Sequence, residues 1–78
     1  MNIIVYTKTH CSCAIEALDF LTIHNIPFEE RDIVMHPEFK IEVEHATGQN
    51  KSPTLKIGDA WLPDAGVEDI AKALKIQV

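Results

Sequence analysis

Residues 3–13 read IIVYTKTHCSC, and this stretch sets the framework for the rest of the chain. The apolar run Ile3–Tyr6 suits a strand that is buried on both faces. A helical pattern begins directly after the second cysteine, so both cysteines lie where a strand passes into a helix. The N-terminus of a helix favours a thiolate, and so do the nearby cation Lys8 and a protonated His10. We therefore expect Cys11 to be a reactive thiol.

The composition is that of one small acidic domain. The chain has 78 residues, of which 46% are apolar, and its net charge is −5. A chain of this length has no room for a second hydrophobic core, so we expect residues 1–78 to form a single domain. Nucleic acids and anionic membranes both attract clustered lysine and arginine. The acidic balance therefore disfavours both as partners.

The sequence shows no pattern of export or membrane insertion. No apolar run approaches the about 18 residues of a membrane span. The N-terminus also lacks a basic segment followed by an apolar stretch and a cleavage site. We expect a cytoplasmic monomer, because in that compartment thiols stay reduced unless they carry out redox chemistry.

Two elements are expected between the cysteines and residue 34. Apolar residues at near-helical spacing predict a helix that stops at Asn25, before Pro27. Its apolar positions are Ala14, Ile15, Leu18, Phe20 and Leu21. Residues 28–34 predict a second strand, although residues 29–32 are polar and alternate only in part.

The second half of the chain predicts a helix, a hairpin and a final helix. Pro37 suits the first turn of a helix that Gly48 closes in the left-handed conformation. This helix carries Phe39, Val43 and Ala46 on one side. Residues 52–57 and 60–62 predict two antiparallel strands joined by a tight Gly-Asp turn. The last helix has an apolar stripe formed by Val67, Ile70, Ala71 and Leu74. The order βαβαββα predicts a four-stranded mixed sheet with helices on both faces.

In this order the residues resemble the glutaredoxins, which are small members of the thioredoxin-fold family. The similar segments are residues 6–8 (Tyr-Thr-Lys) before Cys11, residues 47–49 (Thr-Gly-Gln) followed by Pro53, and residues 65–70. The last of these is similar to the family's Gly-Gly-x-Asp-Asp-Leu segment. The resemblance covers nearly the whole chain and implies an α/β, thioredoxin-like fold with three helices flanking the sheet.

The active-site motif departs from the family pattern. Glutaredoxins usually carry Cys-Pro-Tyr-Cys or Cys-Gly-Phe-Ser, whereas residues 11–14 here read Cys-Ser-Cys-Ala. The usual resolving position is therefore Ala14, and the second thiol, Cys13, comes one residue early. Two further departures are Lys51-Ser52 in place of Thr-Val before the proline and Ala65 in place of a glycine.

The resemblance implies a thiol–disulfide oxidoreductase in which Cys11 is the nucleophile that attacks mixed or protein disulfides. Either Cys13 or a second thiol such as glutathione then resolves the mixed disulfide. Glutathione is implied as the co-substrate, with no tightly bound cofactor, and disulfide-containing proteins are implied as partners. The residues implied in glutathione binding are Lys8, Ser12, Ser52, Pro53, Gly66, Glu68 and Asp69. Within this set, the resemblance implies that Lys8 binds the glycine carboxylate, that Asp69 binds the glutamyl amine, and that Pro53 is cis and lies against the thiol.

The role of Cys13 stays open at this point. Residues two apart in a helix point about 200° away from each other, so a Cys11–Cys13 disulfide needs Cys11 and Ser12 to lie outside the helix. Alternatively, Cys13 is a small buried residue on the inner face of the helix, and Cys11 acts as a monothiol.

Two other functions are compatible with these residues. A metal-binding or iron–sulfur carrier protein would use Cys11, Cys13 and His10 as ligands. Two cysteines are too few for a closed site in one chain, so that function requires a partner ligand or a dimer. A redox-inert interaction domain is disfavoured by the joint presence of Cys11, Lys8 and Pro53.

Overall fold

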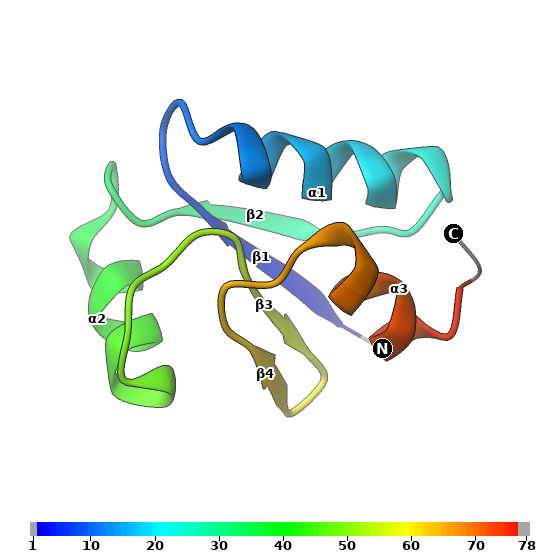
Figure 1. Ribbon diagram of the computed structural model, residues 1–78. Helices are drawn as coiled ribbons and strands as arrows, with labels where there is room; N and C mark the ends of the chain where they lie inside the picture. Colours follow the sequence, from blue (N-terminus) through cyan, green and yellow to red (C-terminus); the bar gives the residue numbers. More distant parts are fainter. Residues whose placement is uncertain (1, 77–78) are drawn as a thin grey trace.

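Strands and helices follow one another in the order that the sequence predicts (Figure 1). The computed structural model describes residues 2–76. Its elements are β1 (Ile3–Thr7), α1 (Ser12–Ile23), β2 (Glu29–Asp32), α2 (Pro37–Thr47), β3 (Thr54–Ile57), β4 (Ala60–Leu62) and α3 (Val67–Leu74). The predicted βαβαββα order is confirmed. No helix within the described residues has the length and apolarity that crossing a bilayer requires.

The strands form one mixed sheet in the order β2-β1-β3-β4. β1 runs parallel to β2 and antiparallel to β3, and β3 and β4 form the predicted antiparallel hairpin. The register pairs Tyr6 near the end of β1 with Thr54 at the start of β3. It also pairs Thr7 with Asp32, the last residue of β2. The loops after β1, after β2 and before β3 therefore meet at the same end of the sheet.

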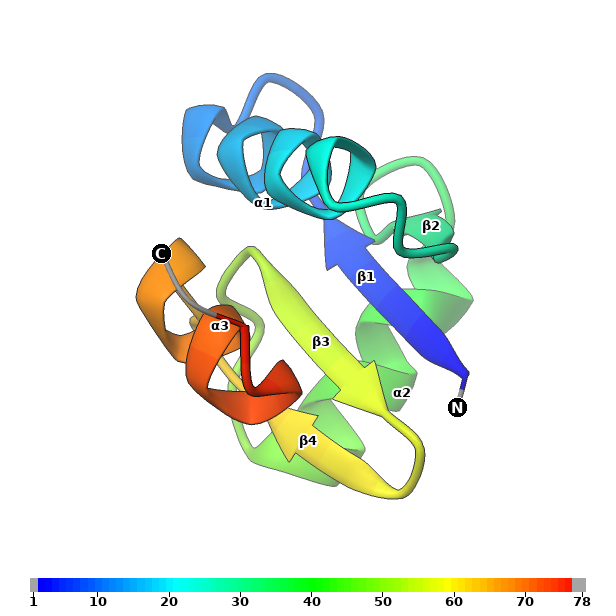
Figure 2. The same ribbon diagram turned by 90° about the vertical axis from the view of Figure 1, so that its right-hand side faces the viewer.

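Helices cover both faces of the sheet, as predicted. Figure 2 shows α1 and α3 on the face nearer the viewer and α2 behind the sheet. Successive strand residues point to opposite faces, so Val5 belongs to one core and Tyr6 to the other. The larger cluster consists of Ile3, Val5, Ala17, Phe20, Leu21, Leu55, Ile57, Ala65, Ile70 and Ala71. The smaller cluster consists of Tyr6, Ile33 and Val43.

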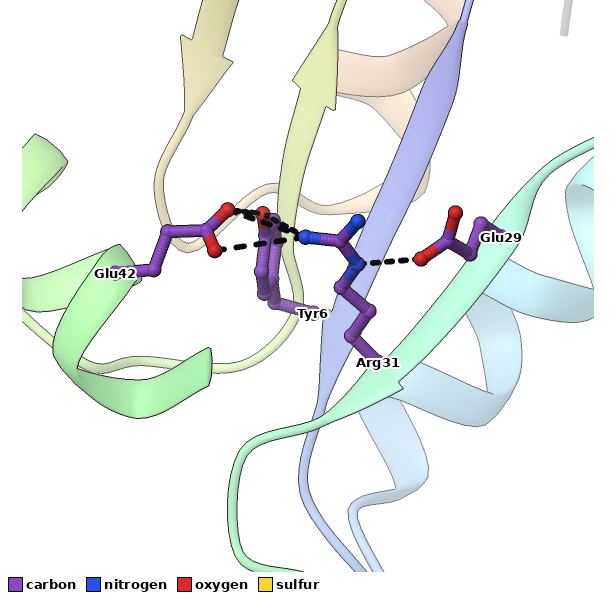
Figure 3. Close-up of polar contacts among 4 residues, drawn as sticks. All are labelled: Tyr6, Glu29, Arg31 and Glu42. Atoms are coloured by element: carbon purple, nitrogen blue, oxygen red, sulfur yellow. Dashed lines mark hydrogen bonds and ion pairs between the residues drawn. The ribbon is translucent and has the colours of Figure 1, made fainter. Parts of the chain in front are cut away.

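A polar network crosses the face that α2 covers (Figure 3). The Tyr6 side chain is fully buried, and its hydroxyl donates a hydrogen bond to the Glu42 carboxylate. Arg31 Nη1 lies 3.2 Å from Glu42 Oε1 and 3.3 Å from the Tyr6 hydroxyl oxygen. Its Nε donates to Glu29 on the same strand. This network explains the charged residue Arg31 in β2. The Arg31 side chain pairs with the carboxylates of Glu29 and Glu42 instead of entering the apolar core.

Some predicted boundaries were wrong. The second strand spans Glu29–Asp32 and not residues 28–34. Asp32 Oδ1 accepts hydrogen bonds from the backbone N–H groups of Val34 at 2.8 Å and Met35 at 3.0 Å, and this turn ends the strand. The third strand begins at Thr54 and not at residue 52.

The helices follow their predicted patterns with two exceptions. Gly48 ends α2 at φ 76°, in the left-handed conformation that its sequence position predicts. However, Ala46 of α2 and Ile15 of α1 are exposed, contrary to the predicted apolar faces. Ile15 remains 54% exposed because it follows the buried Ala14 directly, and neighbouring residues of a helix point in different directions.

Candidate functional site

Cys11 is the residue that precedes α1. Its backbone is extended, at φ −91° and ψ 112°, and Ser12 is the first helical residue. The Cys11 N–H donates to the Lys8 carbonyl at 3.2 Å, which closes a turn after β1. The Cys11 carbonyl accepts the hydrogen bond from the Ile15 N–H at 3.1 Å. The thiol therefore lies at the N-terminus of α1, next to backbone N–H groups that have no partner within the helix.

The loop before β3 brings Ser52 and Pro53 to this thiol. The Cys11 side chain is half-buried, and its S–H group donates to the Ser52 carbonyl over 3.9 Å between sulfur and oxygen. The Ser52–Pro53 peptide bond is cis, as the resemblance implies, and Pro53 is buried. Residues far apart in sequence are thus joined at one end of the sheet.

The surroundings of Cys11 lower the pKa of its thiol. The largest cause is the Ser52 side chain, whose hydroxyl can donate to a thiolate, and burial acts in the opposite direction. The backbone N–H groups of Ala14 and Cys13 and the charge of Lys8 lower the pKa further. Cys11 therefore ionises more readily than an isolated cysteine, and the thiolate is the nucleophilic form.

Cys13 lies in the first turn of α1 and is exposed. The alternative that placed it among buried apolar residues was wrong. It is exposed because a different side of α1 faces the core, and that side is formed by Ala14, Ala17, Phe20 and Leu21. Both cysteines are free thiols in this structure. Cys11 lies outside the helix, as a disulfide between them requires, but Ser12 is already helical.

Lys8, in the loop between β1 and Cys11, lines a surface cavity. The other lining residues are Ile33, Val34, Pro37, Lys40 and Asn50. Two ammonium groups and an amide are thus combined with apolar side chains, which suits a ligand that carries a carboxylate. Sequence reasoning missed Lys40 and Asn50. They belong to α2 and the loop after it, and no local pattern links them to Lys8.

The start of α3 carries the remaining predicted residues. Gly66 precedes the helix, and its N–H donates to Asp69 Oδ2 at 3.0 Å. The other carboxylate oxygen of Asp69 is left for a further donor, and both Asp69 and Glu68 are exposed. The Ala65 N–H donates to the Pro53 carbonyl at 2.9 Å, which ties this segment to the cis-proline.

The described residues form no preformed cluster of metal-ligating side chains. Within residues 2–76, no group of three or more His, Cys, Asp or Glu side chains is placed to hold a metal ion. His10 is exposed, with φ 64°, and it does not join the two cysteines in such a group. A metal bound by Cys11 and Cys13 would therefore need ligands from outside the described residues.

Most of the chain matches a known protein family. The family model of the glutaredoxins matches residues 3–61. The chain belongs to the glutaredoxin family. This family consists of thiol–disulfide oxidoreductases, and its model covers the predicted nucleophile Cys11 as well as the cis-proline Pro53. A comparison with curated proteins gives no match.

Solved structures share the fold over almost the whole chain. A glutaredoxin from Brucella melitensis is 28% identical, with a TM-score of 0.71, over 96% of this chain and 78% of that one. The thioredoxin-like protein BC3987 is 21% identical, with a TM-score of 0.84, over 91% of this chain and 97% of that one. The glutaredoxin-like NrdH-redoxin from Escherichia coli is 24% identical, with a TM-score of 0.78, over 95% of each chain. These similarities confirm the predicted thioredoxin-like fold with its four-stranded mixed sheet and three helices.

Proposed function

We propose that this protein is a thiol–disulfide oxidoreductase in which Cys11 is the nucleophile. The observation that carries the proposal is the position of the Cys11 sulfur at the N-terminus of α1, 3.9 Å from the Ser52 carbonyl oxygen. This position combines partial exposure with a lowered thiol pKa, and both favour attack on a disulfide.

The proposed reaction has two exchanges. The Cys11 thiolate attacks the glutathione sulfur of a protein–glutathione mixed disulfide, and the protein substrate leaves as a thiolate that takes up a proton. Cys11 is now bonded to glutathione. A second glutathione thiolate attacks the glutathione sulfur of that bond, which gives oxidised glutathione and returns the Cys11 thiolate. Cys13 is an alternative resolving thiol if the first turn of α1 opens.

Glutathione is the proposed co-substrate because its charged groups match charges around the thiol. Lys8, supported by Lys40 and Asn50, is proposed to bind a carboxylate in the cavity that they line. Asp69 is proposed to bind the amine, with Glu68 and Gly66 beside it at the start of α3. The remaining proposed contacts are made by Ser12, Ser52 and Pro53, next to the sulfur.

The proposed partners are proteins that carry disulfides, and no tightly bound cofactor is needed. We propose that the protein is a monomer and that it acts in the cytoplasm, because exchange-active thiols are kept reduced in that compartment. The neighbouring NrdH-redoxin is described as a glutaredoxin-like protein with a thioredoxin-like activity profile. The test must therefore distinguish glutathione from a reductase as electron donor.

The test is to titrate reduced protein with oxidised glutathione and to map the adducts by mass spectrometry. We expect one glutathione on Cys11 in the wild type and in Cys13→Ser, and none at that site in Cys11→Ser. Turnover is then measured with glutathione and glutathione reductase, and separately with thioredoxin reductase. An adduct confined to Cys13, or full turnover in Cys11→Ser, would contradict the proposal.

A further inference from the structure

The Ser52 hydroxyl lacks a hydrogen-bond partner although it is buried. Its oxygen is shielded from solvent, and it makes no hydrogen bond among the residues that the structure describes. A buried hydroxyl without a partner costs free energy, so its presence calls for an explanation. The residue lies immediately before the cis-proline, at a position where the glutaredoxins that this chain resembles carry an apolar valine.

The same residue contacts the thiol through its backbone. The Ser52 carbonyl accepts the Cys11 S–H over 3.9 Å. A carbonyl oxygen is only an acceptor, so this contact stabilises the protonated thiol and is lost when the proton leaves. The thiolate needs a donor in its place, and a hydroxyl can donate.

We propose that the Ser52 hydroxyl donates a hydrogen bond to the Cys11 thiolate and so favours its formation. In the thiol form, Cys11 donates to the Ser52 carbonyl, and in the thiolate form it accepts from the Ser52 hydroxyl. Ser52 therefore contacts the reacting sulfur in both states. This inference rests on the proposed function only in taking Cys11 as the attacking thiol.

The electrostatics around Cys11 agree with this role. The Ser52 side chain is the largest cause of the lowered Cys11 pKa, ahead of the backbone N–H groups of α1 and the charge of Lys8. Loss of the hydroxyl should therefore weaken thiolate formation without abolishing it.

The experiment uses a matched pair, Ser52→Thr and Ser52→Val, which have the same shape but differ in the hydroxyl. Both are made in the Cys13→Ser background, so that alkylation and thiolate absorbance report Cys11 alone. The rate of alkylation by iodoacetamide is measured against pH without glutathione. Ser52→Ala is a smaller variant that tests the same loss of hydroxyl, and circular dichroism checks that each variant is folded.

We expect Ser52→Val and Ser52→Ala to move the midpoint of the pH profile upward, and Ser52→Thr to stay close to the parent. Below the midpoint, the two variants without a hydroxyl should alkylate on the order of tenfold more slowly, which corresponds to about 1.4 kcal/mol. A hydrogen bond to a charged group is worth about that much or somewhat more. At high pH, where the thiolate is fully formed in every variant, the rates should converge.

Coincident pH profiles for the valine and threonine variants would overturn the inference. So would a valine variant that loses only glutathione turnover, because Ser52 would then act on the ligand and not on the thiolate. The proposed function is tested by a different result, which is the glutathione adduct of the parent protein. If no adduct forms, the alkylation profiles still show whether Ser52 stabilises the Cys11 thiolate.

Discussion

The Thr9 hydroxyl donates a hydrogen bond to the Asp32 carboxylate, with 2.8 Å between Oγ1 and Oδ2. Thr9 lies in the loop that leads to Cys11, and Asp32 is the last residue of β2. The other Asp32 oxygen accepts from the backbone N–H groups of Val34 and Met35. One carboxylate thus holds together the two loops that carry Lys8 and Val34, and both of these residues line the same cavity.

Asp32→Asn should destabilise the protein by about 1 kcal/mol at neutral pH, because hydrogen bonds to a charged acceptor weaken when the charge is removed and solvent reaches this site. Although burial raises the pKa of Asp32, hydrogen bonds from Met35, Thr9 and Val34 lower it below its ordinary value overall. A lowered pKa in the folded state stabilises the protein above the unfolded pKa of about 3.9. This stabilisation is lost as the pH falls through the folded value.

The measurement is urea unfolding of wild type and Asp32→Asn at neutral and at acidic pH. The difference in unfolding free energy between them should shrink in acid. Asp59→Asn, in the exposed turn between β3 and β4, is the matched control and should change little at either pH. A difference that stays constant with pH would show that the Asp32 charge does not stabilise these loops.

Tyr6 should ionise only in strong alkali. Burial, followed by the hydrogen bond to Glu42 and the negative charge of Glu42, raises the Tyr6 pKa to about 12. The stabilisation from its neutral hydroxyl is therefore fully present below the unfolded pKa of about 10 and is lost as the pH rises through about 12. Since the chain has one tyrosine, its ultraviolet titration reports this group alone.

We expect the folded protein to titrate near the raised value and the urea-unfolded protein near the ordinary one. Tyr6→Phe should lower the unfolding free energy by about 1 kcal/mol at neutral pH, because Glu42 keeps its contact with Arg31. A titration midpoint near 10 in protein that is still folded would refute the buried contact between Tyr6 and Glu42.

Lys8→Ala and Asp69→Asn should each raise the KM for glutathione several-fold. Charge-assisted contacts are worth about 1.5–3 kcal/mol at most, and less where solvent reaches them. The asparagine keeps an oxygen for the Gly66 N–H, so α3 retains its cap while the charge is removed.

Steady-state assays with glutathione, and with a small neutral disulfide, separate ligand binding from thiol reactivity. The glutathione kinetics should change most, and the change should shrink as salt is added. The rate with the neutral disulfide should fall only slightly in Lys8→Ala, because the Lys8 charge is the smallest of the causes that lower the Cys11 pKa. Lys72→Ala, in the exposed last turn of α3, serves as the control cation. Unchanged glutathione kinetics in both site variants would mean that the protein uses a different thiol.

Cys13→Ser should change glutathione turnover little. Ser12 and Cys13 are both helical, so a Cys11–Cys13 disulfide would require the first turn of α1 to open. We therefore expect the mixed disulfide of Cys11 with glutathione to accumulate in the wild type over a range of ratios of reduced to oxidised glutathione. Mass spectrometry of the intact protein is the measurement. Oxidised wild type that lacks an adduct and is lighter by the mass of two hydrogens would instead establish the intramolecular disulfide.

Local sequence patterns predicted a helix or turn well where its conformation is set by residues that are adjacent in the sequence. The left-handed Gly48 ends α2, and the acidic first turn and apolar stripe of α3 are where the sequence places them. β2 was predicted less accurately. Its apolar neighbours Phe28 and Ile33 lie outside the strand, which ends at the Asp32 turn. Whether Asp32 terminates a strand or continues it depends on that side-chain contact, which periodicity does not show.

The sequence alone determined that Cys11 lies between β1 and α1, because the end of an apolar strand and the start of a helix are local properties of neighbouring residues. Only the tertiary structure decided what surrounds that thiol. Parallel pairing of β1 with β2 brings Asp32 to Thr9, and antiparallel pairing of β1 with β3 brings Ser52 to Cys11. It also decided that Cys13 is exposed, since burial depends on which side of α1 the sheet and α3 cover. Such contacts join residues that are distant along the chain, so they follow from strand register and packing and not from any local pattern.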